Sequence, residues 1–183
     1  APSQDDILRK ADKNPNSTGA RLLGLAGPSK EALASDELRR LAAGGKIGAL
    51  VIFYHDPVGF PQYYGEDWVE ALDKVGCLIY VGTNACDTSR KAAIVFPAAA
   101  FAERKGTVTN FEGMVQLQNR AFAPLGEALP GWEIVQKLGK ALGGEFSYAG
   151  AEEIFDELAQ REAAFSDLDY RKIGPQGCKV EIN

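Results

Sequence analysis

The chain has 183 residues, of which 45% are hydrophobic and 25% are charged, a composition typical of a globular protein. This length fits one domain, or one domain with appendages, and is sufficient to bury a sizeable core. The net charge is −5 at pH 7 and Lys and Arg do not gather beyond short pairs such as Arg39-Arg40. Electrostatic binding of nucleic acid is therefore not expected, because it requires a basic face.

Two further function classes are disfavoured by the apolar segments and the cysteines. No segment approaches the roughly 18 consecutive apolar residues that cross a bilayer, and no charged and then apolar leader precedes a cleavage site. We therefore expect a soluble protein without direct membrane insertion. Cys77, Cys86 and Cys178 lack C-x-x-C spacing, so a disulfide framework, a zinc site or a complete set of cluster ligands is not expected. A reducing, cytoplasmic location follows.

The N-terminal part of the chain begins with a polar segment and continues into a helix and a strand. Residues 1–19 are polar and end in a dense turn signal, so they are predicted to form an extension. Leu33, Leu38 and Leu41 then recur at helical spacing before two glycines. The continuous apolar run 47–53 predicts a strand of a parallel sheet that is covered on both faces.

Strands and helices alternate in the middle of the chain. Trp68, Leu72 and Val75 mark one face of a helix, and residues 77–81 form a second apolar strand. A short helix is predicted near Thr88, followed by a third strand at 94–96. This alternation predicts βαβ units with right-handed crossovers and hence a mainly parallel sheet.

The later part of the chain interrupts this alternation with a hairpin-like segment at 106–122. Two amphipathic helices are predicted at 132–142 and 152–163, and the turn-rich segment from Asp167 is predicted to run extended. The fold class is thus α/β, with a Rossmann-like three-layer domain, a mainly parallel sheet, an inserted hairpin-like segment and an extended C-terminal tail. The predicted organisation is an extension, the α/β domain and the tail, at residues 1–19, 20–165 and 166–183.

Residues 94–116 form the most informative stretch, because an apolar strand leads into a Pro and then into a polar segment punctuated by Gly. Pro97 lacks a backbone N–H and ends the strand. Gly106 and Gly113 permit turns, and Asn110 can bond its own neighbouring backbone. From these residues alone, a structural hairpin is favoured over a loop that binds a ligand.

The same stretch resembles a family signature whose elements occur here in order. They are Val95-Phe96-Pro97, Glu103, Gly106-Thr107, Asn110, Glu112-Gly113, Gln116 and Ala123–Glu127. The stretch is similar to the molybdopterin-dependent oxidoreductases, together with the large iron–sulfur subunit of bacterial NADH:quinone oxidoreductase. The segment 16–24 resembles the start of the third domain of this family, so the resemblance covers about residues 16–177. One position departs, because Met114 stands where the family usually has Arg.

A turn after the first strand bears on cofactor binding. His55, the only histidine, lies at the carboxyl end of a predicted parallel strand, where open α/β sheets place their ligands. The resemblance implies a G-x-N-P turn here whose polar side chain helps to hold a nucleotide arm of the cofactor. This chain keeps Pro57 but has Tyr54 and Asp56 in place of Gly and Asn. An anionic Asp56 would repel a pyrophosphate, so a capping turn without a ligand is favoured.

The loop after the second strand, residues 82–90, is rich in small hydroxyl and amide side chains. Such a loop could bind phosphate through backbone N–H groups at a helix N-terminus, although the usual nucleotide fingerprints are absent; capping and turn formation are favoured. If a pterin nucleotide is bound, we expect it to contact Thr83, Asn84, Thr88, Arg90, Asn110 and Gln116. No nucleophilic triad, other catalytic residue or metal ligand is predicted.

The resemblance implies three functional hypotheses. In the first, the chain is a non-catalytic scaffold domain of a protein like the large iron–sulfur subunit of a respiratory NADH:quinone oxidoreductase. It would support assembly of the electron-transfer arm, hold no cofactor of its own, and reach the inner membrane only peripherally, through partner subunits. The absent cysteine clusters, Asp56 and Met114 favour it.

In the alternative hypothesis, the chain is the cofactor-nucleotide-binding domain of a molybdopterin-dependent oxidoreductase, such as a formate dehydrogenase-like enzyme. It would then bind molybdopterin guanine dinucleotide together with other domains. A third hypothesis is a stand-alone interaction module.

A domain taken from a larger subunit should also expose an apolar or aromatic patch, and the candidates are Phe60, Tyr63, Tyr64, Phe111 and Met114.

Overall fold

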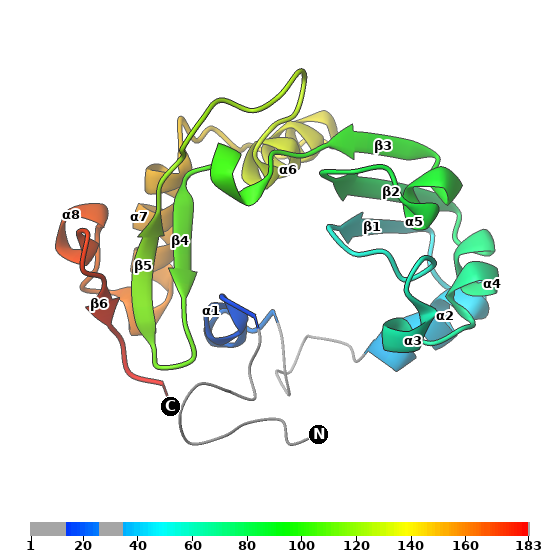
Figure 1. Cartoon of the computed structure of the whole chain (residues 1–183), viewed down its shortest axis with the longest axis horizontal. Helices are drawn as coiled ribbons and strands as arrows, with labels where there is room; N and C mark the ends of the chain where they lie inside the picture. Colours follow the sequence, from blue (N-terminus) through cyan, green and yellow to red (C-terminus); the bar gives the residue numbers. More distant parts are fainter. Residues whose placement is uncertain (1–13, 26–34, 183) are drawn as a thin grey trace. The chain divides into compact units, whose positions relative to one another are not determined.

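The computed structural model describes residues 14–25 and 35–182. Leu33 and most of the predicted N-terminal extension lie outside the described residues. Helices and strands are labelled in Figure 1.

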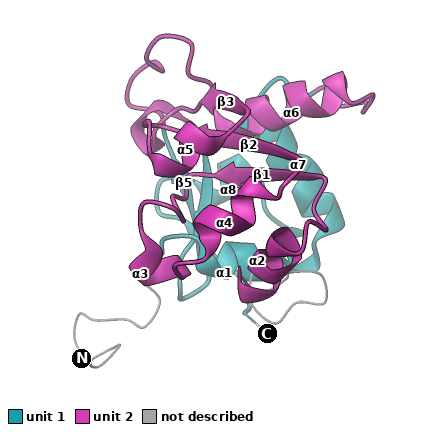
Figure 2. Ribbon diagram, turned by 90° about the vertical axis from the view of Figure 1, so that its right-hand side faces the viewer, with its two compact units in different colours: residues 1–32, 105–119, 148–183 teal, residues 33–104, 120–147 magenta. Residues whose placement is uncertain are grey.

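The chain forms two compact units, each assembled from segments that are distant in sequence (Figure 2). Unit 1 consists of residues 1–32, 105–119 and 148–183, and unit 2 consists of residues 33–104 and 120–147. The organisation expected from the sequence has three consecutive segments, at residues 1–19, 20–165 and 166–183. These domain boundaries stay a prediction.

Unit 2 contains the parallel sheet. Its strands are β1 (Ala49–Phe53), β2 (Cys77–Gly82) and β3 (Ile94–Pro97), in that order and all parallel. All three agree closely with the predicted apolar runs, because each run is strand-length and bounded by turn residues. A mixed α/β unit with a three-stranded parallel sheet is therefore confirmed, whereas the finer Rossmann-like assignment stays a prediction.

Helices pack on both faces of this sheet. Alternate residues of a strand point to opposite faces: Leu50 and Leu78 belong to a cluster with Trp68, while Val81 packs with Ile134. The first face is covered by α2 (Ser35–Ala43) and α4 (Trp68–Asp73), and the second by α6 (Gly131–Ala141). Two short helices, α3 (Pro61–Tyr64) and α5 (Asp87–Lys91), follow β1 and β2.

Strand β1 is less buried than predicted. β2 is buried along nearly its whole length, as expected for a covered strand. The run that became β1 was expected to be fully buried, but its residues are half-buried or exposed. The physical reason is its position, since β1 and β3 are the edges of the three-stranded sheet and only β2 has neighbours on both sides.

Unit 1 is built around an antiparallel sheet. The predicted hairpin is present as β4 (Gly106–Thr109) and β5 (Met114–Gln118), and β6 (Cys178–Lys179) pairs with β5. At the tip, Asn110 Oδ1 accepts hydrogen bonds from the backbone N–H groups of Glu112 and Met114, at 2.9 and 3.0 Å. This confirms the turn predicted for Asn110, and the signature motif is a structural hairpin here.

Gly113 is required at this tip for two reasons. Its φ is +79°, which disfavours residues with a β-carbon. A β-carbon at this position would also come within 2.6 Å of the Val180 carbonyl oxygen, and so close an approach would force the backbone to shift.

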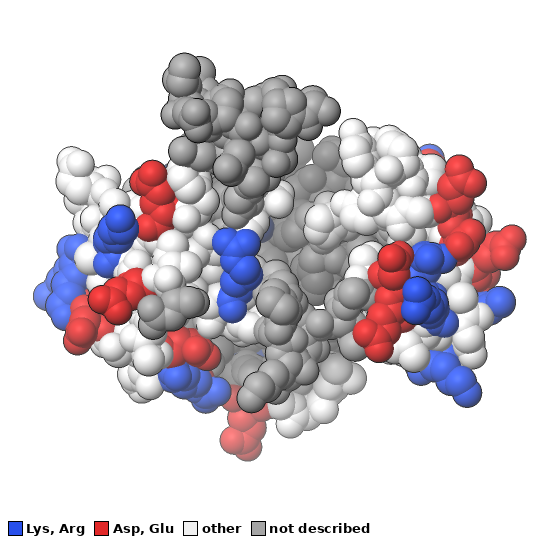
Figure 3. All heavy atoms as spheres, turned by 90° about the horizontal axis from the view of Figure 1, so that it is seen from below, with Lys and Arg blue, Asp and Glu red and all other residues white. Residues whose placement is uncertain are grey.

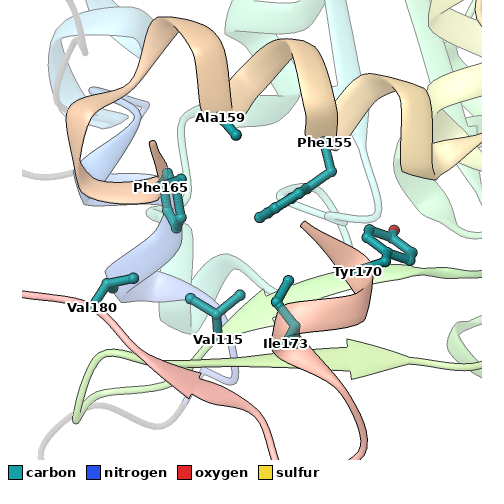
Figure 4. Close-up of a cluster of buried hydrophobic side chains, with 7 residues drawn as sticks. All are labelled: Val115, Phe155, Ala159, Phe165, Tyr170, Ile173 and Val180. Atoms are coloured by element: carbon teal, nitrogen blue, oxygen red, sulfur yellow. The ribbon is translucent and has the colours of Figure 1, made fainter. Parts of the chain in front are cut away.

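The C-terminal segment does not run extended, and this prediction is wrong. It contains α8 (Tyr170–Ile173) and β6, and the short η2 (Ala163–Phe165) comes just before it. Tyr170 and Ile173 are buried together with residues of α7 (Ala151–Arg161). Figure 4 shows the side chains of this cluster converging from helix, turn and strand, and its members are Val115, Phe155, Ala159, Phe165, Tyr170, Ile173 and Val180.

The N-terminal helix α1 (Ser17–Leu22) is a second element that the turn-rich sequence concealed. It is held in unit 1 by side chains whose role no periodicity reveals. Thr18 is fully buried, and Asn16 Oδ1 accepts a hydrogen bond of 2.7 Å from the backbone N–H of Thr109 in β4. The remaining 3-10 turn is η1 (Phe101–Glu103), in unit 2. Within the described residues, no helix has the length and apolar character needed to span a bilayer.

The aromatic residues predicted to be exposed are not buried. Phe60, Tyr63 and Phe111 are exposed, and Tyr64 and Met114 are half-buried. Phe60, Tyr63 and Tyr64 lie together in unit 2, where the rings of Phe60 and Tyr63 are 6.4 Å apart. Phe111 and Met114 belong to unit 1, whereas the other three residues belong to unit 2.

Ile173 tests whether the C-terminal segment belongs to the core of unit 1. We expect Ile173→Ala to destabilise this unit by about 2–4 kcal/mol, because the side chain is 1% exposed and its loss leaves a cavity. Both tryptophans lie in unit 2, so native-state hydrogen exchange of the β5 and α7 amides is the suitable measurement. Ile182→Ala, at a side chain that is 45% exposed, is the control. Equal protection in the two variants would contradict this packing.

Candidate functional site

A cleft opens at the carboxyl ends of β1 and β2 in unit 2. Parallel strands bring the loops that follow them to one edge of the sheet, here residues 54–60 and 83–87. The cleft encloses about 560 Å³. It is lined by Tyr54, Asp56, Gly59, Phe60, Tyr64, Tyr80, Thr83, Asn84, Ala85, Cys86, Asp87 and Arg90.

Asp56 joins the two loops at the floor of this cleft. Its Oδ1 accepts three hydrogen bonds: 2.9 Å from the Thr88 backbone N–H, 2.6 Å from Thr88 Oγ1 and 3.0 Å from the Gly59 backbone N–H. Thr88 is fully buried, and its Oγ1 also accepts a 3.2 Å bond from the Val58 N–H. The loop after β1 is therefore fixed to the start of α5 by one carboxylate and one hydroxyl.

These bonds stabilise the ionised form of Asp56. Burial by itself raises the pKa of this carboxyl group, but the bond from the Thr88 side chain and those from backbone N–H groups outweigh it. The pKa of Asp56 consequently lies below its ordinary value of 3.8. The cleft thus has a permanent negative charge on its floor at neutral pH.

The backbone N–H groups at the start of α5, which were considered for phosphate binding, bond to side chains of this chain. The Thr88 N–H donates to Asp56, and the Ser89 N–H donates to Cys86 Sγ at 3.4 Å. Cys86 is the residue that precedes the helix, and its backbone N–H donates to Ser89 Oγ in return. These N–H groups are therefore capped by side chains, as the structural interpretation of this loop predicted.

Aromatic side chains form much of the remaining lining. Tyr54 has a φ of +57°, which few residues other than Gly adopt, and this is the position where the resemblance implied Gly. Its hydroxyl accepts a 3.0 Å hydrogen bond from Arg104, whose guanidinium also lies 5.0 Å from the centre of the ring. Nearby, His55 Nδ1 lies 2.7 Å from the Tyr64 hydroxyl.

A buried phenol also belongs to this lining. Tyr80 is 5% exposed, and burial raises its pKa, to which a hydrogen bond with the Cys86 side chain adds. Tyr80 is therefore neutral throughout the range of ordinary experiments. The interaction gives Cys86, the residue that precedes α5, a positional role.

Of the six predicted contact residues, three are brought together in the cleft. Thr83, Asn84 and Arg90 line it and are exposed. Asn84 Nδ2 donates to Thr83 Oγ1 at 3.1 Å, and Arg90 forms an ion pair with Asp87. Thr88 lies beneath the cleft and acts through Asp56.

The other two predicted residues lie in unit 1. Asn110 holds the hairpin tip, and Gln116 is an exposed residue of β5 opposite Val108. Whether they contact a ligand stays a prediction. Met114, the departure from the family signature, pairs with Lys179 in the same sheet.

Glu103 shows how another residue of the signature acts. Its buried carboxylate accepts hydrogen bonds from the backbone N–H groups of Ala100, at 2.8 Å, and Leu125, at 3.1 Å. Both partners lie in or beside the motif, so Glu103 ties the segment after β3 to residues 123–127. This role is structural.

Sequence reasoning missed several residues of the cleft. Phe60, Tyr64 and Tyr80 were not predicted to line a site, although Phe60 and Tyr64 had been expected at the surface. The signal for them was their position within a few residues of the ends of two parallel strands. Asp56 had been placed in a capping turn and named as a group that would repel a pyrophosphate. Its hydrogen bonds to Thr88 could not be predicted, because they do not follow from a local pattern.

Charges elsewhere on the surface are mixed. In Figure 3 the acidic and basic side chains of the described residues lie interspersed on the face shown. A second hollow, of about 470 Å³, lies in unit 1 between residues of η2 and the segment at β6, and it contains none of the predicted contact residues. Among the described residues, no group of three or more His, Cys, Asp or Glu side chains is arranged to hold a metal ion.

Comparison with known proteins places this geometry in a family. The profile described as "Molybdopterin oxidoreductase" matches residues 17–141. The chain belongs to the molybdopterin oxidoreductase family. The resemblance noted from the motif at 94–116 is thereby confirmed at this level.

Relatives within the family are subunits of several enzymes. The chain is 38% identical over 137 residues to the F420-dependent formate dehydrogenase 2 subunit alpha of Methanococcus maripaludis, covering 72% of this chain and 20% of that protein. It is 32% identical over 156 residues to the assimilatory nitrate reductase catalytic subunit of Bacillus subtilis, covering 82% and 22%. The chain thus spans about a fifth of the length of these relatives.

A solved structure shares the fold. Acetylene hydratase from Pelobacter acetylenicus superimposes with a TM-score of 0.64 at 14% identity, over 82% of this chain and 21% of that chain. At this identity the likeness concerns the fold alone. The formate dehydrogenase and nitrate reductase relatives do not point specifically to the large iron–sulfur subunit of NADH:quinone oxidoreductase, so they favour the alternative hypothesis over the scaffold hypothesis.

The Thr88 hydroxyl is expected to stabilise unit 2. Thr88→Val removes the hydroxyl's bonds to Asp56 and Val58, keeps the bond from the backbone N–H and keeps the volume of the side chain, so we expect a loss of about 1–3 kcal/mol. Urea unfolding followed by tryptophan fluorescence measures it, because Trp68 and Trp132 both lie in unit 2. In the control Thr83→Val, an exposed hydroxyl is removed, and the expected change is within about 0.5 kcal/mol. Similar losses in both variants would contradict the role of Thr88.

Asp56 should also set part of the acid stability of unit 2. Its folded pKa is lowered, so its contribution is fully present above the ordinary value of 3.8 and is lost as pH falls through the folded value. Asp56→Asn removes this titration, and the stability of the variant should fall less steeply than that of the wild type below about pH 4. Urea midpoints measured over the acid range, from about pH 6 to about pH 2.5, test this. Parallel acid limbs would show that Asp56 is not perturbed.

Proposed function

We propose that this chain is the domain that binds the nucleotide arm of a molybdopterin cofactor, in an oxidoreductase similar to the formate dehydrogenases. The family membership and the names of the relatives support this interpretation. The single observation that carries it is the cleft at the carboxyl ends of β1 and β2, where open α/β sheets bind nucleotides.

The residues of the cleft fit the base and the ribose better than a buried pyrophosphate. The rings of Tyr54, Phe60 and Tyr64 provide apolar and aromatic surface against which a purine can stack. Asn84 can donate and accept hydrogen bonds, and Thr83 adds a hydroxyl. Asp56 occupies the N–H groups that a buried phosphate would need.

Arg90 provides the remaining cationic group in the lining. It is exposed and forms an ion pair with Asp87. A solvent-exposed ion pair contributes little stability, so it can be broken at low cost. A phosphate of the nucleotide arm would therefore be met at the exposed rim, by Arg90, and the nucleoside would lie over the floor.

In this proposal the chain binds and orients the nucleotide arm, while the bound cofactor would supply the redox chemistry. Domains outside these 183 residues would complete the cofactor site, because the chain spans about a fifth of its relatives. Partners are accordingly other domains or subunits of an oxidoreductase, and electron transfer, respiratory coupling and location depend on them.

Binding of GDP to the chain tests the proposal. We expect GDP to shift the backbone amide signals of Thr83, Asn84 and Arg90 in a ¹⁵N-labelled sample, with a dissociation constant in the millimolar range because a part of the site is tested alone. Arg90→Ala should weaken binding by about tenfold, the usual value of one charge-assisted hydrogen bond.

Arg161→Ala provides the matched control. Arg161 is also an exposed helical arginine in an ion pair with a neighbouring carboxylate, and it lies in unit 1. GDP binding should be unchanged in this variant. If GDP produces no shifts in the cleft of the wild-type chain at millimolar concentration, the nucleotide-binding function is wrong and the scaffold hypothesis gains support.

A further inference from the structure

The two carboxylate oxygens of Asp56 have different surroundings. All three hydrogen bonds from Gly59 and Thr88 end on Oδ1, and the backbone N–H of Asp87 also bonds to this carboxylate. Oδ2 instead lies beside the α-carbon of Gly59, because a β-carbon added there would come within 2.1 Å of it. Gly59 and Asp56 both line the cleft, so one oxygen holds the fold and the other borders the ligand space.

This division makes the structural and the ligand-facing roles of the residue separable. An Asn at position 56 could keep the three bonds to Oδ1, since an amide oxygen accepts as a carboxylate oxygen does. It would place an NH₂ group, a pure donor, where Oδ2 now stands. The choice between Asp and Asn at this position therefore reverses the hydrogen-bonding polarity of the cleft floor without requiring a different backbone.

From this geometry we infer that Asp56 is the specificity-determining residue of the cleft: its Oδ2 selects a neutral, hydrogen-bond-donating group of the ligand, such as a ribose hydroxyl, and excludes a phosphate from the floor. The inference rests on the proposed function and deepens it, since it assigns the nucleoside rather than the pyrophosphate to the floor. An anion placed beside an ionised carboxylate is repelled, whereas a hydroxyl donates to it.

Other charged groups of the lining are consistent with this assignment. Asp87 and Arg90 form an ion pair with each other at the exposed rim, so they leave the floor under the influence of Asp56. Tyr80, a buried residue of the lining that is hydrogen-bonded to Cys86, adds no positive charge. Arg90 is the one Lys or Arg among the described lining residues, and Arg104 lies outside the lining, against the Tyr54 side chain.

A pair of isosteric variants tests the selection. Guanosine and GDP are titrated into the wild-type chain and into Asp56→Asn, and the ratio of their dissociation constants is compared. We expect the dissociation constant of GDP divided by that of guanosine to fall by about tenfold in Asp56→Asn, because a negative charge close to the ligand is replaced by a hydrogen-bond donor. Asp36→Asn, which removes an exposed carboxylate of α2 outside the cleft lining, makes the same change in net charge and should leave the ratio unchanged.

The outcomes separate this inference from the proposed function. If both ligands bind in the cleft but the ratio is the same in all three proteins, Asp56 does not select the ligand, and the proposed function stands. If neither ligand binds to the wild type, both are overturned. An Asp56→Asn ratio that changes no more than that of Asp36→Asn would assign the effect to net charge and overturn the selection.

A measurement on the wild type makes the test independent of how well the variant folds. The carboxyl carbon of Asp56 is followed by NMR while guanosine or inorganic pyrophosphate is added. We expect its signal to shift with guanosine and not with pyrophosphate at equal concentration. A shift of equal size with pyrophosphate would show that phosphate reaches the floor and would overturn the inference.

Discussion

The hydrogen bonds between Asp56 and Thr88 are the interaction on which the cleft depends. The loop after β1 and the start of α5 are distant in sequence and belong to different βα units, so neither local turn chemistry nor strand pairing fixes one against the other. A fully buried hydroxyl and a single carboxylate oxygen do so. Because such bonds are costly to leave unmade in a buried site, the two loops are held at a definite separation.

This constraint explains why the cleft has its present chemistry. The N–H groups that start α5 would suit an anion, yet they already receive one from within the chain. What remains available to a ligand is one carboxylate oxygen, several aromatic faces, small polar side chains and a rim arginine. That set suits a nucleoside with its phosphate directed outward, and it is compatible with the proposed binding of a pterin nucleotide.

The signature motif has a different role from the cleft. Asn110 closes a hairpin, Glu103 ties two loop segments together, and Gly113 allows a close approach to Val180. Each of these residues supports the backbone of this chain, and contact of Asn110 with a ligand stays a prediction. Glu103 belongs to unit 2, whereas Asn110 and Gly113 belong to unit 1. A motif that is continuous in sequence therefore contributes to both units.

Elements with a strong local period or composition could be predicted without the folded structure. The three apolar runs became the parallel strands, and the amphipathic patterns became α2, α4, α6 and α7, because burial of an apolar face outweighs other terms at these lengths. The loops after β1 and β2 were recognised as neighbours of a possible site, since the carboxyl ends of parallel strands share one edge. Which residues face each other depends instead on contacts between distant segments. The short α1 and α8 are stabilised by packing rather than by periodicity, and the bonds of Asp56 to Thr88 join residues with no local relation. Which oxygen of that carboxylate borders the ligand space is likewise a property of the folded chain alone, because it is set by the positions of its hydrogen-bond donors.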